Sequence, residues 1–287
     1  MYKVNNRLTP YLLIAPALLI VTLLFGGGVL LALLQSFNYM PLIGLNDFSL
    51  VAWRSIFQQA AFTQSLLLTL WVAFASTLIS TVLAIGCALL LRNTRRGKGL
   101  IMFIFQLNIP IPHIVGAVGI LLLFSQSGLL ARIAAQVGLI TQPSDFPALV
   151  NDRYGIGIIL EYVWKETCFT GVIVLSALQG LGEEMGQAAA TLGANRWQRF
   201  RHITLPLIAP AIFSASILVF AFSFGAYEVP FLLGQRFPSM LPVLAYRSYT
   251  DIDLTARPEA MAMSMIIAII ITVLILIYQR IINRNNQ

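Results

Sequence analysis

Residues 62–91 read FTQSLLLTLWVAFASTLISTVLAIGCALLL, an apolar run without a single Asp, Glu, Lys or Arg. About 20 residues of this kind cross the hydrocarbon core of a bilayer as an α-helix. Inside lipid every backbone N–H and C=O group must find a partner within the protein, which a helix provides by itself. The run lacks the alternation of apolar and polar residues that a membrane β-strand would show. It therefore predicts a transmembrane helix.

Further apolar runs of similar length lie on both sides of this one. The 287-residue chain is 58% hydrophobic and 10% charged, with a mean hydropathy of +0.83, whereas soluble domains are about one quarter charged. The first run is too long for the apolar core of a signal peptide, so we expect it to be retained. The predicted fold class is an all-α integral membrane protein with about six transmembrane helices, at residues 11–36, 62–91, 100–124, 155–180, 206–233 and 259–282.

The loops between these helices alternate in charge. Acidic residues balance the basic residues of the first, third and fifth loops. Basic residues dominate the N-terminus, the second and fourth loops and the C-terminus: Lys3, Arg7, Arg92, Arg95, Arg96, Lys98, Arg196, Arg199, Arg201, Arg280 and Arg284. Because basic loops stay in the cytoplasm, we expect both termini there. The net charge of +7 thus marks orientation rather than a nucleic-acid surface.

Residues 37–61 and 125–153 carry apolar side chains that indicate amphipathic pieces at the membrane interface, with simple anchoring as the alternative. Cys87 and Cys168 lie within apolar runs. We expect them to be small buried hydrophobic residues rather than a disulfide or a metal-binding pair.

The fourth loop carries the most informative pattern of the chain, since residues 177–206 read ALQGLGEEMGQAAATLGANRWQRFRHITLP. Residues 185–192 are rich in helix-forming side chains, and Gly193 follows where a left-handed helix cap would lie. A second, basic helix is predicted over residues 195–203, and Pro206 is expected to open the next span. The loop is therefore predicted to form a helix, a glycine turn and a second helix that project from the membrane.

This loop resembles the conserved cytoplasmic loop of permeases in binding-protein-dependent ABC importers. The family pattern is Glu-Ala-Ala, three residues, Gly, nine residues and Ile-x-Leu-Pro. The residues that match it here are Ala188, Ala189, Gly193, Ile203, Leu205 and Pro206. Gln187 stands where the family has Glu, so Glu183 and Glu184, one helical turn earlier, are candidates to supply the acidic charge instead.

The resemblance implies the type I ABC importer permease fold in a bacterial inner membrane. Residues 1–61 would form an N-terminal transmembrane helix and outward loop, and residues 62–287 a permease core with its coupling loop at about 181–205. The chain would be a non-catalytic subunit without a metal or cofactor of its own. Its partners would be ATPase subunits that bind ATP and Mg²⁺, a second permease subunit (a copy or a homologue), and an extracytoplasmic substrate-binding protein.

Ionisable and polar side chains inside the spans are costly and are candidates for the substrate path. Those singled out are Asn108, Glu161, Trp164, Glu166, Tyr227 and Glu228. Each has a structural alternative. Glu161 and Lys165 could pair on one helix face, and Glu228 could bond the backbone freed around Pro230, where glycine and proline indicate a broken helix. Pro110, Pro112 and His113 indicate a second interruption, which lines the path or only kinks the helix.

The substrate class follows from two weak indications. The spans hold more acidic than basic residues, which suits a cation, and residues 223–234 resemble the polyamine, iron and phosphonate branch of the family more than the sugar branch. We therefore expect a spermidine- or putrescine-like polyamine. Sugars, iron, phosphonates and opines are the alternatives.

Other functions were weighed against this one. An intramembrane enzyme would need a motif such as His-Glu-x-x-His, and an ATPase a phosphate loop, and neither motif is present in the sequence. A carrier that works without an ATPase would have no need of the loop at 187–206. A membrane scaffold without transport predicts no substrate-dependent ATP hydrolysis.

Overall fold

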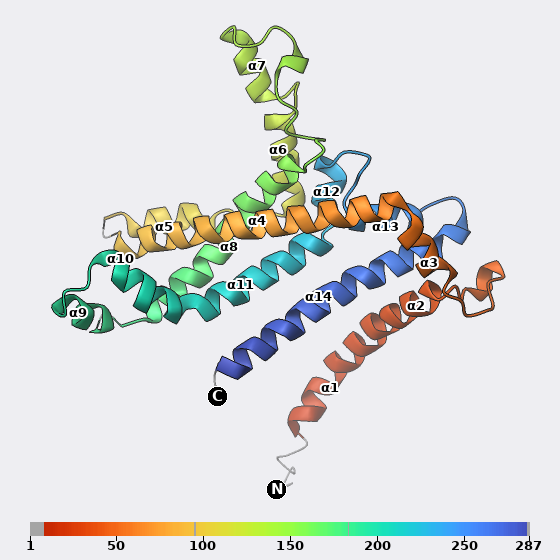
Figure 1. Cartoon of the computed structure of the whole chain (residues 1–287), viewed down its shortest axis with the longest axis horizontal. Coiled ribbons are helices and arrows are strands. Elements are labelled where there is room, and N and C mark those ends of the chain that lie inside the picture. Colours follow the sequence, from red (N-terminus) through yellow and green to blue (C-terminus); the bar gives the residue numbers. More distant parts are fainter. Residues whose placement is uncertain (1–8, 95, 183, 286–287) are drawn as a thin grey trace. The chain divides into compact units, whose positions relative to one another are not determined.

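The computed structural model describes residues 9–94, 96–182 and 184–285 (Figure 1). Helices make up the regular structure of this described part, and its β pairing is limited to one isolated bridge between Met40 and Leu45. The all-α prediction is thus confirmed. The chain divides into two compact units, which are described separately: Met1–Phe62 with Leu244–Ala268, and Thr63–Val243 with Ile269–Gln287.

The first unit contains the N-terminal helical run. Helix α1 (Thr9–Val21), the π-helical turn η1 (Thr22–Gly26) and α2 (Gly27–Ser36) follow one another without a break. The short helix α3 (Val51–Gln58) is amphipathic, with Ala52 and Ile56 on its buried side.

Glu259, from the beginning of α14, ties the C-terminal part of this unit to α3. Its carboxylate accepts hydrogen bonds from Ser55 Oγ at 2.6 Å and from Gln59 Nε2 at 2.9 Å. The amphipathic piece predicted in 37–61 therefore exists and is held by polar contacts.

The second unit contains most of the remaining helices. In chain order they are α4 (Ala60–Asn93), α5 (Lys98–Gln106), α6 (His113–Phe124), α7 (Leu129–Gln136), α8 (Ile156–Gly180), α9 (Glu184–Thr191), α10 (Arg196–Arg199), α11 (Leu205–Gly225) and α12 (Glu228–Leu233). Two further helices, like the start of α4, cross the boundary between the units: α13 (Leu241–Tyr249) and α14 (Arg257–Asn285).

Helix α8 is the centre of the second unit, because α5, α6, α11 and α12 all contact it. One apolar cluster packs around Ile158 and Tyr162 near its first turns, and another around Val174, Leu175 and Leu178 near its last. Figure 1 shows α9 and α10 at one end of the α8–α11 pair and α6 and α7 at the other. The two candidate sites described below are thus both built on α8 and its neighbours.

Five helical runs of the described residues are long and apolar enough to cross a membrane: Pro10–Ser36, Ala60–Asn93, His113–Gln136, Arg196–Gly225 and Leu254–Arg280. The helix predicted at 155–180 is present as α8, which has 25 residues. It has the length of a span, but Glu161, Lys165 and Glu166 make it too polar to count as one by composition.

Two predicted helices are interrupted. The helix expected at 100–124 ends as α5 at Gln106 and resumes as α6 at His113, because Pro110 and Pro112 have no N–H to continue the hydrogen-bond ladder. The helix expected at 206–233 breaks at Ala226, whose extended backbone separates α11 from α12. The glycine and proline around Glu228 had indicated this second break.

Candidate functional site

The turn between α9 and α10 has the geometry that a glycine makes possible. The backbone N–H of Gly193 donates to the Ala190 carbonyl, and that of Ala194 donates to the Ala189 carbonyl, both at 3.0 Å. These two bonds form a Schellman motif with Gly193 in the left-handed region, at φ +84°. The glycine cap predicted after the first helix of this loop is therefore present.

The second helix of the turn begins with a reciprocal cap. The Asn195 side-chain oxygen accepts from the backbone N–H of Gln198 at 2.8 Å, and the Gln198 side chain accepts from the backbone N–H of Asn195 at 2.9 Å. This capping box fixes where α10 starts.

The predicted second helix begins after Asn195, and Pro206 lies in the first turn of α11 as expected, but the predicted separation between the two is wrong. Helix α10, the π-helical turn η4 (Phe200–Thr204) and α11 form one helical run from Arg196 to Gly225. Pro206 lies at the start of α11 but inside this longer run, where its missing N–H removes one bond from the helical ladder. The wider π turn immediately before it lets the helix continue through the proline.

The residues predicted to couple to an ATPase lie on or beside this turn. Gln187, Ala188 and Pro206 are exposed, whereas Ala189, Ile203 and Leu205 are half-buried. Glu183 lies outside the described residues, and so does the side chain of Glu184.

Sequence reasoning missed three large apolar side chains that the turn exposes. Met185, Leu192 and Trp197 are 61%, 88% and 63% exposed. Exposed apolar groups on a projecting helical turn are typical of a surface that another protein covers. Their exposure depends on the direction in which the turn leaves α9, which the spacing of apolar residues did not reveal.

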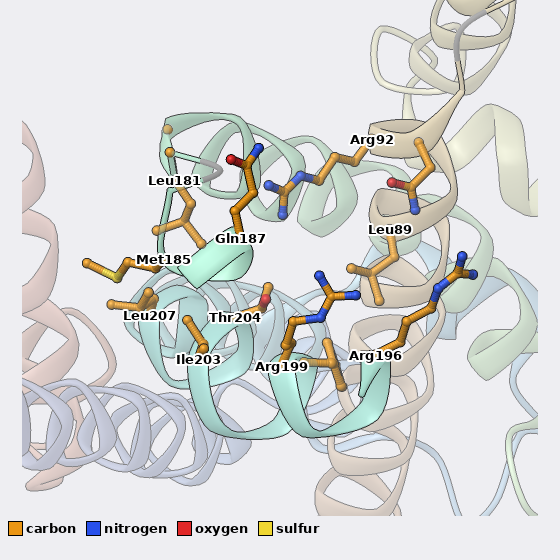
Figure 2. Close-up of a pocket in the computed structure, with 14 residues that line it drawn as sticks. Leu89, Arg92, Leu181, Met185, Gln187, Arg196, Arg199, Ile203, Thr204 and Leu207 are labelled. Atoms are coloured by element: carbon orange, nitrogen blue, oxygen red, sulfur yellow. The ribbon is translucent and has the colours of Figure 1, made fainter. Parts of the chain in front are cut away.

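A cleft of about 890 Å³ lies behind this turn (Figure 2). Its walls come from the end of α4, the end of α8, α9 and the α10–α11 run. Figure 2 shows the side chains of Arg92, Arg196 and Arg199 around it, together with the amide of Gln187. The cleft therefore combines basic groups with apolar walls, which include Leu89, Ile203 and Leu207.

A second polar cluster joins α8 to the break between α5 and α6. Lys165 Nζ donates to the backbone carbonyl oxygens of Asn108 at 2.7 Å and Ile109 at 3.2 Å, and also to that of Ile111. In return, Asn108 Nδ2 donates to the carbonyl oxygen of Trp164 at 2.8 Å. These contacts supply partners to backbone groups that the two prolines leave outside any helix.

The predicted pair between Glu161 and Lys165 is not among the ion pairs of the described residues. Glu161 instead faces His113, the first residue of α6, whose Nδ1 lies 3.2 Å and 3.4 Å from its two carboxylate oxygens. The other ring nitrogen of His113 lies 3.8 Å from Glu166 Oε1. The side chain of Glu161 is fully buried and that of Glu166 nearly so, so one imidazole serves two carboxylates away from solvent.

A cavity of about 310 Å³ adjoins this cluster. His113, Lys165 and Glu166 give it a polar side, and the rings of Phe169 and Phe222 with three aliphatic residues give it an apolar one. The His113 ring lies against that of Phe222, with 4.5 Å between centroids. The sequence suggested His113 only as a part of the interrupted helix, because nothing in its spacing placed it between two glutamates of another helix.

The remaining path candidates lie around this cluster. Trp164 is 43% exposed. A Cβ at Gly116 of α6 would lie 2.8 Å from the Trp164 ring, so the missing side chain lets the two helices approach. Tyr227 stacks on Phe231 with 5.1 Å between centroids. Glu228 is exposed in the first turn of α12, and it makes no hydrogen bond to the backbone around Pro230 within the described ranges.

Metal binding was considered as well. Among the described residues, no group of three or more His, Cys, Asp or Glu side chains has an arrangement that could hold a metal ion. Cys87 and Cys168 are free thiols, and only Cys168 is fully buried.

The sequence was then compared with known protein families. Residues 80–286, well over half of the chain, match the family described as binding-protein-dependent transport system inner membrane component. The chain belongs to this family. The matched region contains both candidate sites, namely the turn around Gly193 and the cluster around Lys165. This permease family membership makes the chain a multi-pass protein of the inner membrane.

The names of relatives in the family mention different substrates. The chain is 29% identical to the thiamine transport system permease protein ThiP of Brucella abortus over 266 residues, and this alignment covers 91% of this chain and 45% of ThiP. This chain thus spans about half the length of ThiP. It is 25% identical over 278 residues to the sn-glycerol-3-phosphate transport system permease protein UgpA of Agrobacterium fabrum, covering 94% and 92% of the two chains. The trehalose/maltose transport system permease protein MalF of Thermococcus litoralis is 26% identical over 217 residues, covering 74% of this chain and 68% of MalF.

Solved structures support the fold. A bacterial ABC transporter involved in the import of the acidic polysaccharide alginate superposes with a TM-score of 0.81 at 18% identity, covering 99% of this chain and 98% of the other. The MetNI methionine ABC transporter gives 0.54 at 19% identity, covering 77% and 94%. At these identities the likeness concerns the fold, which is that of an ABC importer permease.

Proposed function

We propose that this chain is the membrane-spanning permease subunit of an ATP-driven importer, which forms the translocation path and couples to a separate ATPase. The observation that carries the proposal is the α9–Gly193–α10 segment, which exposes Met185, Leu192 and Trp197. An ATPase subunit that covers this segment would remove three large apolar side chains from water. Family membership supports the same function.

The coupling residues have distinct roles in this proposal. Ala188 and Ala189 keep α9 narrow enough for a partner to approach, and Gly193 sets the direction of the chain after it. Ile203, Leu205 and Pro206 join the turn to α11, so a force on the turn reaches the helix that packs on α8. Gln187 offers an amide to the partner, and Glu183 and Glu184 are proposed to supply the acidic charge.

The proposed assembly includes other proteins. Two ATPase subunits would bind ATP and Mg²⁺, a second permease subunit would complete the path, and an extracytoplasmic binding protein would deliver the substrate. In support of this, a relative of this fold is an alginate transporter in complex with its substrate-bound periplasmic protein, with a TM-score of 0.79. Both termini and the α9–α10 turn would lie in the cytoplasm, where the basic loops belong.

For the substrate we propose an organic cation of the spermidine or putrescine kind. Glu161 and Glu166 share the single imidazole of His113, while the ammonium of Lys165 is already bonded to backbone carbonyls. The cavity lining holds one carboxylate, Glu166, and one ammonium, Lys165, and the buried Glu161 adds a second carboxylate next to it. Two carboxylates against one ammonium, beside the rings of Phe169 and Phe222, favour a cationic group both by charge and by cation–π attraction. Thiamine, in the name of one relative, is also an organic cation, whereas sugars and glycerol phosphate in the names of others are not.

The test is the ATPase activity of the complex purified through this chain. The complex would be reconstituted in nanodiscs with its binding protein and challenged with polyamines, thiamine, sugars and amino acids. Stimulation by a cation supports both parts of the proposal. Stimulation by a sugar alone would keep the importer and reject the cation. Failure to recover an ATPase subunit in mild detergent would instead favour a carrier that works without ATP.

A further inference from the structure

The cleft behind the α9–α10 turn is lined in part by Met185, Gln187 and Ile203 of the proposed coupling surface, and it also holds positive charge to which the proposed coupling gives no role. Three guanidinium groups line it, from Arg92, Arg196 and Arg199, and its described lining includes no acidic side chain. Arg199 interacts with another residue. Arg92 and Arg196 form no ion pair with any residue of the described ranges, so their charge is left uncompensated there. Like charges gathered in one cleft attract an anion.

The position of the cleft along the helices indicates which anion. Arg92 lies in the last turn of the span Ala60–Asn93, and Arg196 is the first residue of the span Arg196–Gly225. Since both arginines line the same cleft, it lies at the ends of two helical runs that are long and apolar enough to cross a membrane. Leu89 and Leu207, one turn or more further into these runs, form its apolar wall, and Leu207 is 45% exposed. The cleft is thus basic at the ends of these runs and apolar toward their middle.

We infer that this cleft binds an anionic phospholipid, with Arg92 and Arg196 holding the headgroup phosphate and Leu89 and Leu207 contacting the first part of an acyl chain. A guanidinium group can donate two parallel hydrogen bonds to a phosphate, which gives both charge and orientation. Basic pockets between membrane helices are known to hold acidic headgroups in this way. A lipid bound there would brace the base of the turn against the ends of α4 and α11 (Figure 2).

Other occupants fit the cleft less well. Free inorganic phosphate would satisfy the arginines but leave Leu89 and Leu207 facing water. A zwitterionic lipid brings its own ammonium, which opposes the field of the arginines. An ATPase subunit is expected on the exposed side chains of Met185, Leu192 and Trp197. Of these three, only Met185 lines the cleft, so a partner that covers Leu192 and Trp197 need not fill it.

The test is native mass spectrometry of the full chain in detergent, titrated separately with phosphatidylglycerol, phosphatidylcholine and inorganic phosphate. The variant that carries both Arg92→Gln and Arg196→Gln is expected to raise the apparent Kd for phosphatidylglycerol about 30-fold, and either change alone about fivefold. Arg280→Gln is the matched control, because Arg280 ends another apolar span but does not line the cleft. Its Kd is expected to stay within about twofold of the unchanged chain.

Each other outcome rejects the inference. An equal loss in Arg280→Gln would show attraction to the whole basic side of the protein rather than a site. Equal binding of phosphatidylcholine, or displacement of the lipid by millimolar inorganic phosphate, would reject an anionic phospholipid as the occupant. Displacement by added ATPase subunit would make the cleft a protein interface. If the double variant does not fold, the two single variants and the charge-preserving Arg92→Lys, which is expected to lose less affinity than Arg92→Gln, decide the question.

Discussion

Lys165 Nζ lies 2.7 Å from the backbone carbonyl oxygen of Asn108. This hydrogen bond joins α8 to the break between α5 and α6. This single ammonium also bonds the carbonyls of Ile109 and Ile111, so it completes a stretch of backbone that two prolines keep out of any helix. A membrane helix can be interrupted only where other groups satisfy its backbone. The charge on α8 and the break in the neighbouring helix are therefore one structural feature.

Lys165→Met should destabilise the protein by about 2 kcal/mol, because the carbonyl oxygens of Ile109 and Ile111 lose their ammonium donor and that of Asn108 keeps only the N–H of Ile111. Thermal unfolding in detergent, followed by a thiol-reactive dye, would show a lower Tm than that of the unchanged protein. Lys98→Met is the control, since Lys98 begins α5 at the far side of the same helix and does not bond to the break. An equal Tm for the two variants would show that Lys165 has no such role.

The second prediction concerns the carboxylate beside the cavity. Glu166→Gln keeps the size of the side chain and removes its charge, so cation uptake should fall about tenfold or more if the substrate contacts it. Uptake of labelled spermidine into proteoliposomes is the measurement, and recovery of the ATPase subunit reports assembly. Asp47→Asn, which changes an exposed loop carboxylate, should leave uptake unchanged. Unaltered uptake in Glu166→Gln with an intact complex would remove this cluster from the substrate path.

Glu228 tests whether the path extends to the second helix break. It is exposed at the first turn of α12, where the positive end of a helix dipole stabilises a carboxylate. Glu228→Gln should reduce uptake and leave assembly intact, and the same spermidine assay measures this. Should uptake be normal, Glu228 only caps its helix and the path does not reach it.

The sequence predicted the helices well and their interruptions less well. Long apolar runs identified the N-terminal span, α4 and α14, because length and hydropathy are enough to define a helix in lipid. The same reasoning extended one helix through residues 107–112 and separated α10 from α11. Both errors concern prolines. The effect of a proline depends on its surroundings: at the α5–α6 break Lys165 donates hydrogen bonds to the free carbonyl oxygens, whereas before Pro206 the π-helical turn Phe200–Thr204 lets the helix continue.

The candidate sites divide in a similar way. The turn at Gly193 was predictable because left-handed backbone geometry favours one residue type. The contact of His113 with Glu161 was not, since their proximity depends on α6 and α8 packing closely at Gly116. Local sequence can encode a cap, but a contact between distant segments depends on how the helices pack.

Gly193→Ala should weaken the coupling to the ATPase because it strains the backbone of the turn, not because the new methyl group clashes with a neighbour. A Cβ at Gly193 would meet no atom within 4 Å, but the position has φ +84°, which costs an alanine about 1 kcal/mol or more. The turn should therefore populate other conformations, and substrate-stimulated ATPase activity should fall severalfold. Gly99→Ala is the matched control, because a Cβ there also meets nothing and the backbone is not in the left-handed region. A similar loss in both variants would contradict a special role for the turn.

The last prediction concerns the acidic charge that the family pattern places at position 187 and that this chain lacks. If Glu183 and Glu184 supply it, the double change Glu183→Ala and Glu184→Ala should lower substrate-stimulated ATPase activity about tenfold, as loss of a charge-assisted hydrogen bond across an interface does. Adding Gln187→Glu should then restore part of the activity, because it returns a carboxylate to the helix that faces the partner. Rescue distinguishes a lost charge from a damaged helix, which a new glutamate would not repair. If the double variant keeps its coupling, Gln187 serves through its amide alone, and the charge of the family residue is dispensable in this chain.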